Sequence, residues 1–588
     1  MSADESLING ERISTSNQKQ TGLQKYISRR LLMKSSATVL CATAASGFAP
    51  GAQAAVKKES TNAPVSDNEP SIVASDETAI VETVSGKVRG YIRDGIYTYK
   101  GIPYGATTEG PARFMPPQKA KPWTGVRSSM QYGRVSPQGA RDGWDHDEEA
   151  WLFSWDDGIP GEDCLRVNLW TPGVNDHKKR PVMVWLHGGG YYAGSGQELR
   201  SYDGERLSRR GDVVVVSLNH RLGPLGYLNL ANYGDRYASS SNVGMLDIVA
   251  ALEWVRDNIS NFGGDPGNVT IFGQSGGGGK VGTLMAMPDA KGLFHRAIIQ
   301  SGSILRAGSM EKTEQLAASV LSELNLSASQ VDELQKLPVQ KLIDAGAAAL
   351  KKMQPPGMFD WRKIADWLGW GPVVDGKVLP QHPFDPGAPK MSADVPLLVG
   401  TTLNEFFSAI GHPEAEAMTQ ADLKKGVGNL YGEKAASIIE IFTAAHPHEK
   451  PFDIFSRIMA APIRQSAVTQ AGLKAALGAA AAYLYWFAWK TPVLDGRPRA
   501  FHCSELSFCF DNTDRCENMT GGGAGPRALA ANISDAWINF ARKGDPNHPG
   551  IPHWAAFTAE NCPTMIFDKQ CEARNNPDTK ERQAVTAA

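Results

Sequence analysis

Six short runs of nearly uninterrupted apolar residues constrain the fold of this chain more than any other feature of its sequence. The runs occupy residues 181–190, 212–219, 268–273, 296–302, 395–402 and 482–489. Strands that are buried on both faces of a mostly parallel sheet have this composition, because neither face meets water. Helical patterns lie between the runs, such as "GMLDIVAALEWVRDNI" (244–259), in which apolar residues recur every three or four positions. The alternation predicts an α/β fold, with a mostly parallel central sheet flanked by helices.

Other regions of the chain add to this predicted core. The segment from Ile80 alternates in polarity and breaks at glycines, which is typical of an antiparallel hairpin. Residues 310–352 and 414–475 have the pattern of helical insertions. We therefore expect one large domain over residues 79–571, followed by a loose polar tail over residues 572–588.

The N-terminal part of the chain has a different composition. "SRRLLMK" (28–34) precedes a mildly apolar stretch of small residues, which ends in the cleavage pattern Ala-Gln-Ala at 52–54. This pattern resembles a twin-arginine export signal, so we expect residues 1–54 to be removed and the mature protein to be periplasmic or secreted. The alternative is a disordered tail with a chance pair of arginines. Residues 55–78, rich in Ser, Asn, Pro and charge, are expected to form a disordered linker.

Charge and hydropathy argue against several kinds of partner. The formal charge is −2, from 60 basic and 62 acidic residues, and it becomes −5 once residues 1–54 are removed, with 54 basic against 59 acidic. This balance gives no reason to expect nucleic acid as a partner. The longest apolar run, residues 475–489, has 15 residues and is too short to span a bilayer, so no stable membrane insertion is expected after signal cleavage. Both a monomer and a dimer remain open.

Ser275 lies in "GQSGG" (273–277), a match to the G-x-S-x-G pattern. In a strand-turn-helix setting, glycines let the backbone close around the serine, and the strained turn pushes its hydroxyl out above the sheet. The setting fits, because a buried-strand pattern precedes the motif and "GKVGTLMAM" can continue it as a helix. The alternative is a serine in a flexible glycine-rich loop, so the decision depends on whether the chain supplies the partners of a nucleophile.

A serine hydroxyl needs a base, and the base needs an orienting acid. In hydrolases with this turn the order along the chain is Ser, acid, His, each after a strand of the sheet. Glu405 follows the run "VPLLVG", and His502 follows the run "YLYWFAW" and a Pro/Gly-rich loop. His548 and His553 are rival bases, but they lie beyond a further helical pattern and are expected in surface loops.

The segment "LHGGGYYAGSG" (186–196) follows a predicted strand and is a loop of the HGGG type. Glycines in such a loop allow backbone N–H groups to come within about 3 Å of a substrate oxygen. Their purpose would be to stabilise the negative charge that develops on an attacked carbonyl oxygen. Alone this segment is compatible with a simple turn, but it precedes a matching serine motif.

In these motifs and their order, the chain resembles the type-B carboxylesterases, a family of α/β-hydrolases that includes cholinesterases and bacterial p-nitrobenzyl esterases. The resemblance runs from about Ile80 to Phe567 and includes "GEDCLRVNLWTP", "VMVWLHGGGYYAGSG" and "AFHCSELSF" in family order. It implies the α/β-hydrolase fold and a carboxylesterase domain over residues 79–571. Position by position, it implies a nucleophile, an acid and a base at Ser275, Glu405 and His502, and oxyanion-hole donors at Gly189, Gly190 and Gly276.

Several positions depart from the family's usual pattern. Gln274 stands where the family has Glu, which removes a negative charge that would favour cationic substrates, and Gly276 stands where it has Ala. The usual Asp-Glu-Gly around the acid is Asn-Glu-Phe at 404–406. Lys280 replaces a small residue, and its role is not apparent from the sequence. Residues 55–163 hold no cysteine, so Cys164 is expected to lack the bridge that many members form.

The resemblance implies a serine ester hydrolase that works through an acyl-enzyme and needs no metal or organic cofactor. The expected substrate is a small ester with a short to medium acyl or aryl group. The alternative is a non-catalytic binding or adhesion member of the same fold, which would lack the nucleophile, acid or base. Residues 141–158, with three tryptophans and seven acidic residues, could form an aromatic lid or a solvated loop. His146 in this segment could suggest a metal site, but we expect a charged surface cluster there instead.

Overall fold

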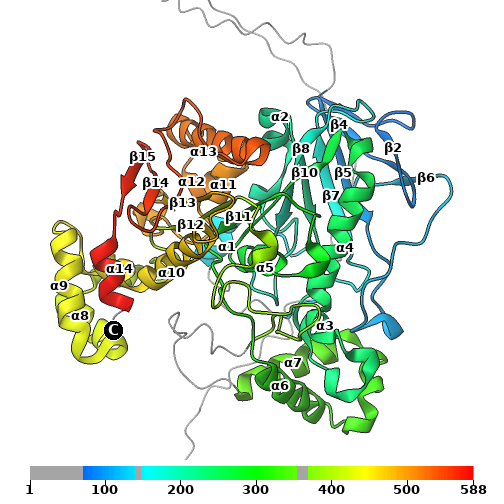
Figure 1. Cartoon of the computed structure of the whole chain (residues 1–588), viewed down its shortest axis with the longest axis horizontal. Helices are drawn as coiled ribbons and strands as arrows, with labels where there is room; N and C mark the ends of the chain where they lie inside the picture. The colour runs from blue at the N-terminus through cyan, green and yellow to red at the C-terminus, as the bar shows by residue number, and fades with distance from the viewer. Residues whose placement is uncertain (1–70, 140–146, 354–368, 587–588) are drawn as a thin grey trace, which may run out of the picture. The chain divides into compact units, whose positions relative to one another are not determined.

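The structure, a computed structural model, describes residues 71–139, 147–353 and 369–586. A twelve-stranded sheet in the order β1-β4-β5-β7-β9-β8-β10-β11-β12-β13-β14-β15 is its central element (Figure 1). The strands are β1 Ile72–Val73, β4 Tyr91–Arg93, β5 Ile96–Pro103, β7 Arg166–Thr171, β8 Arg180–Leu186, β9 Val214–Leu218, β10 Gly264–Gln274, β11 Arg296–Gln300, β12 Leu397–Thr402, β13 Ala482–Phe487, β14 Pro563–Phe567 and β15 Glu572–Asn575.

The middle of this sheet is parallel and its two edges are antiparallel. The strands from β9 to β14 all pair in parallel. The strands β1, β4, β5 and β7 on one side and β15 on the other pair antiparallel with their neighbours. The six apolar runs became β8 to β13, so the predicted mostly parallel sheet is confirmed.

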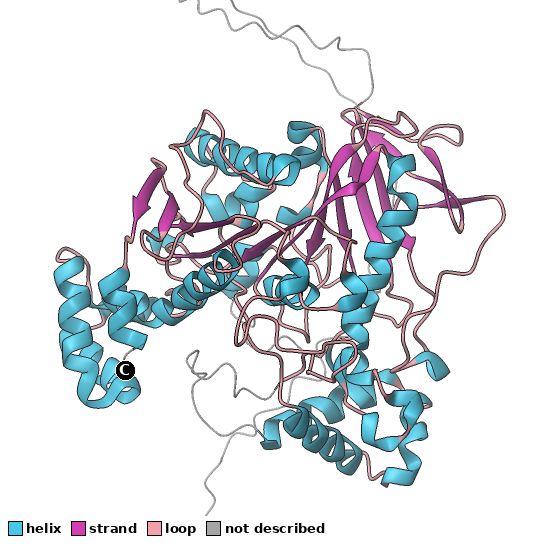
Figure 2. Cartoon of the chain, viewed as in Figure 1, coloured by secondary structure: helices cyan, strands magenta, loops and turns pink. Residues whose placement is uncertain are grey.

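Strand β8 shows why these runs are apolar throughout. Val182, Val184 and Leu186 belong to one buried cluster, which includes side chains of helix α4 (Val243–Asn258). Met183 and Trp185, which alternate with them, belong to a second cluster that includes side chains of helix α13 (Ala524–Lys543). Because successive side chains of a strand point to opposite faces, the two clusters lie on opposite sides of the sheet. Helices cover both faces (Figure 2), so neither face of β8 meets water.

The predicted helical insertions are also present. Residues 310–353 form α6 and α7, and residues 420–475 form α8, α9 and α10, whose apolar faces build a third small cluster. The described α-helices are α1 Asp147–Phe153, α2 Glu205–Gly211, α3 Gly223–Tyr227, α4, α5 Gly276–Leu284, α6 Met310–Glu323, α7 Val339–Met353, α8 Gln420–Tyr431, α9 Ala435–Ala445, α10 Pro451–Ala475, α11 Leu506–Cys509, α12 Glu517–Thr520, α13 and α14 Thr579–Thr586. None of the helices in the described ranges is long and apolar enough to cross a membrane.

The structure corrects the expected polar tail over residues 572–588. β15 continues the large sheet, and α14 packs against the cluster of α8, α9 and α10 through the buried Val585. Buried Arg582 donates to Asp578 at 3.0 Å and to Gln465 at 2.7 Å. The buried polar groups of this segment are hydrogen bonded and its other polar side chains are at least partly exposed, so polarity alone gave the wrong prediction.

The N-terminal region also differs from the prediction in detail. β1 lies within the expected linker, 55–78, yet it pairs with β4. Instead of one hairpin from Ile80, the structure has two. The first joins β2 (Ile80–Thr83) and β3 (Gly86–Arg89) in a separate three-stranded sheet with β6 (Val126–Ser128), and the second joins β4 and β5 in the large sheet. Residues 1–70 lie outside the described residues, so the expected signal and most of the linker do too.

Candidate functional site

Ser275 occupies a sharp turn between the end of β10 and the start of α5. Its backbone angles are φ 57° and ψ −127°, a region that residues with a side chain rarely adopt. The Ser275 N–H donates to the carbonyl of Gln300 at the end of β11 (2.8 Å), and the N–H of Gly279 donates to the Ser275 carbonyl (3.1 Å). The turn is therefore held by the sheet on one side and by the first turn of α5 on the other. The strand-turn-helix setting predicted for the motif is present.

The glycines around Ser275 are required by close contact with the end of β8 and the loop after it. A Cβ atom on Gly277 would lie 2.0 Å from the carbonyl oxygen of Leu186, and one on Gly276 would lie 2.2 Å from that of Gly190. A Cβ on Gly273 would meet the backbone of Gly277 at 2.5 Å. These neighbours are backbone atoms, which cannot turn aside as a flexible side chain can. The departure from Ala at 276 therefore matches a close approach of the glycine loop.

The glycine loop after β8 lies directly against this turn. Gly189 and Gly190 have φ angles of 78° and 61°, which favour glycine. The carbonyl of Gly189 accepts from the N–H groups of Tyr192 and Ala193, at 3.3 and 3.0 Å, and this closes the loop. The N–H groups of Gly189 and Gly190 donate no hydrogen bond to another described residue. The Gly276 N–H is one of the unpaired donors at the start of α5.

His502 and Glu405 lie together on the neighbouring loops. The Oε2 of Glu405 is 2.5 Å from the Nδ1 of His502, and the two loops are also joined by a backbone hydrogen bond from the N–H of His502 to the carbonyl of Glu405 (2.8 Å). Glu405 is 1% exposed. A carboxylate in contact with Nδ1 holds the imidazole in one tautomer and leaves Nε2 to exchange protons.

Two of the residues that depart from the family pattern contact the imidazole of His502. Phe406 stacks on it, with ring centroids 3.8 Å apart and an angle of 30° between the planes. The Nε2 of Gln274 is 3.0 Å from Nε2 and 3.3 Å from Nδ1 of His502. An atom nearly equidistant from both ring nitrogens cannot lie on the in-plane axis of either, so the amide lies over the ring. Phe406 already covers one face, and the amide therefore covers the other.

Ser275 and His502 are not hydrogen bonded to each other in the described part of the chain. Since the amide of Gln274 lies over the ring, it does not occupy the in-plane direction of the His502 Nε2. Hydrogen bonds between catalytic groups are often long without substrate and shorten when it binds. Of the rival bases, His548 instead donates from its Nε2 to the carbonyl of Asn532 (2.9 Å), and His553 is exposed.

Two residues that the sequence did not single out hold the other oxygen of Glu405. Its Oε1 accepts from the hydroxyl of Ser301 at 2.7 Å and from the N–H of Thr402 at 2.9 Å. Ser301 directly follows β11, and the edge formed by the carboxyl ends of the parallel strands also carries Ser275 and Glu405. Position just after a buried strand is the only signal in the sequence that could have identified Ser301.

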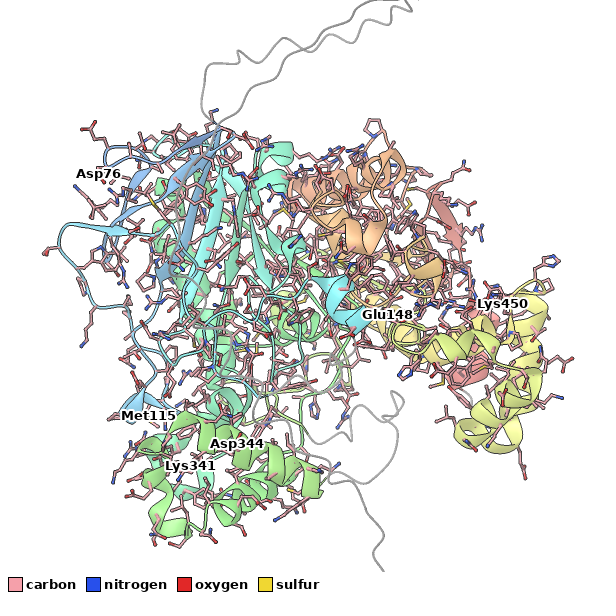
Figure 3. All side chains as sticks on the ribbon, turned by 180° about the vertical axis from the view of Figure 1, so that it is seen from behind. Asp76, Met115, Glu148, Lys341, Asp344 and Lys450 are labelled. Atoms are coloured by element: carbon pink, nitrogen blue, oxygen red, sulfur yellow. The ribbon has the colours of Figure 1, made fainter. Side chains whose placement is uncertain are left out.

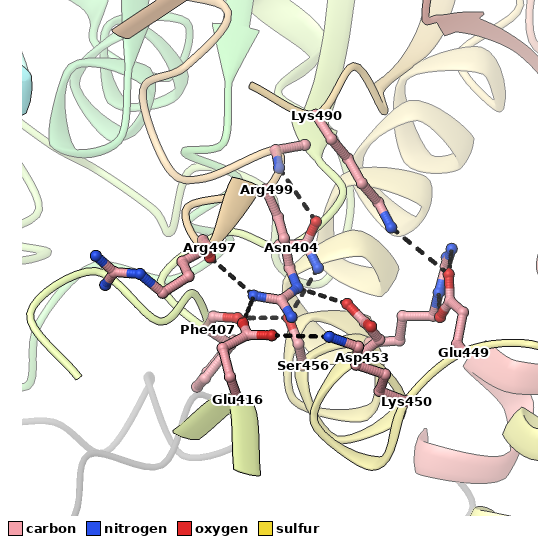
Figure 4. Close-up of polar contacts among 12 residues, drawn as sticks. Asn404, Phe407, Glu416, Glu449, Lys450, Asp453, Ser456, Lys490, Arg497 and Arg499 are labelled. Atoms are coloured by element: carbon pink, nitrogen blue, oxygen red, sulfur yellow. Dashed lines mark hydrogen bonds and ion pairs between the residues drawn. The ribbon is translucent and has the colours of Figure 1, made fainter. Parts of the chain in front are cut away.

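A buried polar network fixes the acid and histidine loops to α10 (Figure 4). Asn404 donates to the hydroxyl of Ser456 (2.9 Å) and accepts from the N–H of Ala500 (3.3 Å). Arg499 binds Asp453 at 2.5 Å and Glu416 at 2.6 Å. Asn404, one of the departures from the family, thus ties the loop of Glu405 to that of His502.

Part of the tryptophan-rich and acidic segment packs beside the histidine loop. Residues 147–153 form α1, where Glu148 (Figure 3) makes a two-point ion pair with Arg497, at 2.7 and 2.9 Å. Phe153 contacts Phe501 edge-on, with ring centroids 5.7 Å apart. Arg497 holds the pKa of the Glu148 carboxyl below its usual value. This helix fixes residues 147–153 of the segment beside the histidine loop, while residues 141–146 lie outside the described residues.

The other side chains considered from the sequence fall into simpler classes. All six cysteines in the described ranges are free, including the buried Cys164. Three tryptophans before "GPVVDG" could, from the sequence, line an acyl pocket or belong to the core. Of these, Trp370 is a core residue that packs on Gly346 of α7, whereas Trp361 and Trp367 lie outside the described residues. Within the described ranges, no group of three or more His, Cys, Asp or Glu residues is arranged to hold a metal ion. His146 is outside those ranges.

A mostly parallel sheet with a serine on a strained turn between strand and helix, and acid and histidine loops at the same edge, defines the α/β-hydrolase fold. Comparison with known proteins then identifies the family. The model of the Carboxylesterase family matches residues 77–585, so the chain belongs to this family and is a carboxylesterase. The match extends beyond residue 571, which agrees with the packed β15 and α14.

Several relatives and solved structures are similar over almost their whole length. The para-nitrobenzyl esterase of Bacillus subtilis (strain 168) is 35% identical over 86% of this chain and 98% of its own. The phenmedipham hydrolase of Pseudarthrobacter oxydans is 33% identical over 83% of this chain and 94% of its own. The structure of an esterase from Clostridium hathewayi that can hydrolyse aliphatic aromatic polyesters is 36% identical, with a TM-score of 0.75, and covers 88% of this chain and 99% of its own.

Proposed function

We propose that this carboxylesterase acts through a Ser275–His502–Glu405 triad and an acyl-enzyme intermediate. The observation that carries the proposal is the 2.5 Å contact between Glu405 Oε2 and His502 Nδ1, beside a serine held at φ 57°. The N–H groups of Gly189 and Gly190, which donate to no other group in the described part of the chain, support it.

In the proposed reaction, the Oγ of Ser275 attacks the ester carbonyl and passes its proton to the Nε2 of His502. The negative charge that forms on the carbonyl oxygen is held by the N–H groups of Gly189, Gly190 and Gly276. The intermediate then breaks its bond to the alcohol, which leaves with the proton from His502. His502 then takes a proton from a water molecule, whose oxygen attacks the acyl-serine carbonyl. As the bond to the Ser275 Oγ breaks and the acid is released, His502 returns that proton to the Oγ. Glu405 orients the imidazole and stabilises its charged form throughout.

We propose esters with short to medium acyl or aryl groups as substrates. A relative named as a para-nitrobenzyl esterase, and a structurally similar esterase that can hydrolyse aliphatic aromatic polyesters, support an aryl preference. Two exposed aromatic side chains near the candidate site point the same way. Phe406, on the imidazole, is 44% exposed, and Tyr192, which follows the glycine loop, is 59% exposed. Such rings can pack against an aryl group without requiring a charge on the substrate.

Hydrolysis of a p-nitrophenyl ester series, from acetate to palmitate, tests the triad with the mature protein beside Ser275→Ala. We expect short-chain activity to fall by about 10⁴-fold or more in the variant. Ser309→Ala is a matched control, because Ser309 is the N-cap of α6, where its hydroxyl accepts from the N–H of Lys312, and its loss should leave kcat unchanged. Equal inactivity of wild type and Ser275→Ala on every ester would favour the non-catalytic binding alternative.

We also propose that residues 1–54 direct export to the periplasm or the medium. The paired arginines, the small apolar stretch and the Ala-Gln-Ala pattern support this, and the family match begins only at residue 77. Replacing Arg29 and Arg30 by Lys should retain the protein in the cytoplasm at its full mass. N-terminal sequencing of the exported protein should begin at Ala55. An intact N-terminus on extracellular protein would contradict the proposal.

A further inference from the structure

Lys280 is a buried lysine that the proposed reaction does not use. It lies on α5, five residues after Ser275, and it is 0% exposed. Its Nζ donates a hydrogen bond to the carbonyl oxygen of His187 at 2.9 Å. Burying an amine is costly unless it is well paired, so a lysine at a position where the family has a small residue calls for an explanation.

The carbonyl that Lys280 binds belongs to the peptide group leading into the glycine loop. His187 is followed directly by Gly188, Gly189 and Gly190. Because α5 begins at Gly276, one short helix carries both a proposed oxyanion donor and the amine that reaches the loop of the other two donors. A shift of His187 would move Gly189 and Gly190 relative to Gly276.

Residues of the glycine loop and of neighbouring segments surround Lys280. Its Nζ is 5.9 Å from the centre of the Tyr191 ring, and the charge of buried Glu198 favours its protonated form. The imidazoles of His187 and His220 stack at 5.0 Å, and burial, together with the charge of Lys280, holds the pKa of His220 well below its usual value. The amine is thus enclosed by the residues that support the glycine loop.

We propose that Lys280 is a positioning residue for the oxyanion hole: by binding the His187 carbonyl it fixes the glycine loop against α5. Its effect rests on the proposed esterase mechanism, since it acts through the N–H groups of Gly189 and Gly190. Oxyanion donors are effective because they are already oriented before the charge develops, so a small displacement weakens the transition state more than the bound substrate.

The chain offers a matched control in Lys474 on α10. Lys474 is also buried and its Nζ donates to a backbone carbonyl, that of Ala393, at 2.6 Å. Burial lowers the pKa of both amines, to about 7 for Lys280 and about 8 for Lys474. Both lysines are therefore buried amines that donate to a backbone carbonyl. They differ in the residue they bind, which is His187 for Lys280 and Ala393 for Lys474.

The test compares Lys280→Met, Lys280→Gln and Lys474→Met in the mature protein. For Lys280→Met we expect kcat to fall by about 10- to 100-fold, less than the loss of a whole donor, with KM changed less than about threefold. The affinity for a boronic acid that mimics the tetrahedral intermediate should fall by the same factor as kcat. Lys280→Gln keeps an N–H donor and should recover part of kcat, and it carries the test if Lys280→Met does not fold.

Lys474→Met should keep kcat and analogue affinity within about twofold, whatever it costs in Tm. The proposal is overturned if folded Lys280 variants keep wild-type kcat and analogue affinity, or if kcat follows Tm equally in all three variants. Either result leaves the esterase mechanism intact as long as wild type is active and Ser275→Ala is not. Inactive wild type would instead reject the mechanism itself.

Discussion

The two sides of the candidate site are built in different ways. On the serine side, Ser275 and the glycine loop are placed by backbone packing so close that a Cβ on Gly277 would lie 2.0 Å from a carbonyl oxygen. On the histidine side, His502 is placed by side chains: the carboxylate of Glu405 at Nδ1, the ring of Phe406 on one face and the amide of Gln274 over the other. A backbone site depends on glycine, whereas a side-chain site can vary in sequence and keep its geometry.

Because of this difference, we expect a single added methyl group to reduce stability and activity most on the serine side. Gly277→Ala places a Cβ against the carbonyl of Leu186, a backbone atom of the central strand β8. We expect a loss of stability of about 1–3 kcal/mol or more, together with near-complete loss of esterase activity, because the glycine loop must move away from Ser275. Thermal unfolding and p-nitrophenyl acetate hydrolysis measure the two effects.

Gly428→Ala provides the control, because Gly428 lies within α8 and a Cβ there has nothing within 4 Å. It should stabilise the protein by about 0.5–1 kcal/mol, the helix preference of Ala over Gly, and leave kcat unchanged. Wild-type stability and activity in Gly277→Ala would mean that the serine side can relax, and the contrast between the two sides would disappear.

The histidine side should lose activity without losing its fold. Glu405→Gln keeps the shape of the side chain but replaces a carboxylate oxygen facing the His502 Nδ1, so the imidazole loses its orienting charge. We expect kcat to fall by about 10³- to 10⁴-fold while Tm changes by only a few degrees.

Ser301→Ala removes one hydrogen-bond donor to the other oxygen of Glu405. The lost hydrogen bond is worth about 1 kcal/mol, so kcat should fall about fivefold. A larger loss in Ser301→Ala than in Glu405→Gln would contradict the assignment of the acid.

The sequence predicted the serine side better than the histidine side for the same physical reason. Strands buried on both faces are apolar throughout, so β8 to β13 could be located from composition alone, and the glycines around Ser275 reflect contacts that no other residue tolerates. The contacts of Gln274 and Phe406 with His502 join segments far apart in the chain, which no local pattern encodes. The packed tail was missed because its buried groups, such as Arg582 and Asp578, are polar and become satisfied only on folding.

The last test separates the two sides through the pH dependence of stability. On the histidine side, burial and the nearby Glu405 raise the pKa of Glu505 from 4.5 to about 8, and its Oε2 has no hydrogen-bond partner among the described residues. Between these values the folded state binds more protons than the unfolded state, so the free energy of unfolding falls as the pH rises through this window. Glu505→Gln removes the titrating group and should flatten that fall.

On the serine side the sign is opposite. Burial lowers the pKa of Lys280 from 10.5 to about 7, so between these values the unfolded state binds more protons and the free energy of unfolding rises with pH. Each slope can reach at most about 1.4 kcal/mol per pH unit, the value for one proton. Denaturant unfolding from pH 5 to pH 10 should therefore show Glu505→Gln departing from wild type mainly below about pH 8 and Lys280→Met mainly above about pH 7. If Glu505→Gln and Lys280→Met change the free energy of unfolding over the same pH range, the two buried groups do not titrate separately. The contrast between the serine side and the histidine side would then be wrong.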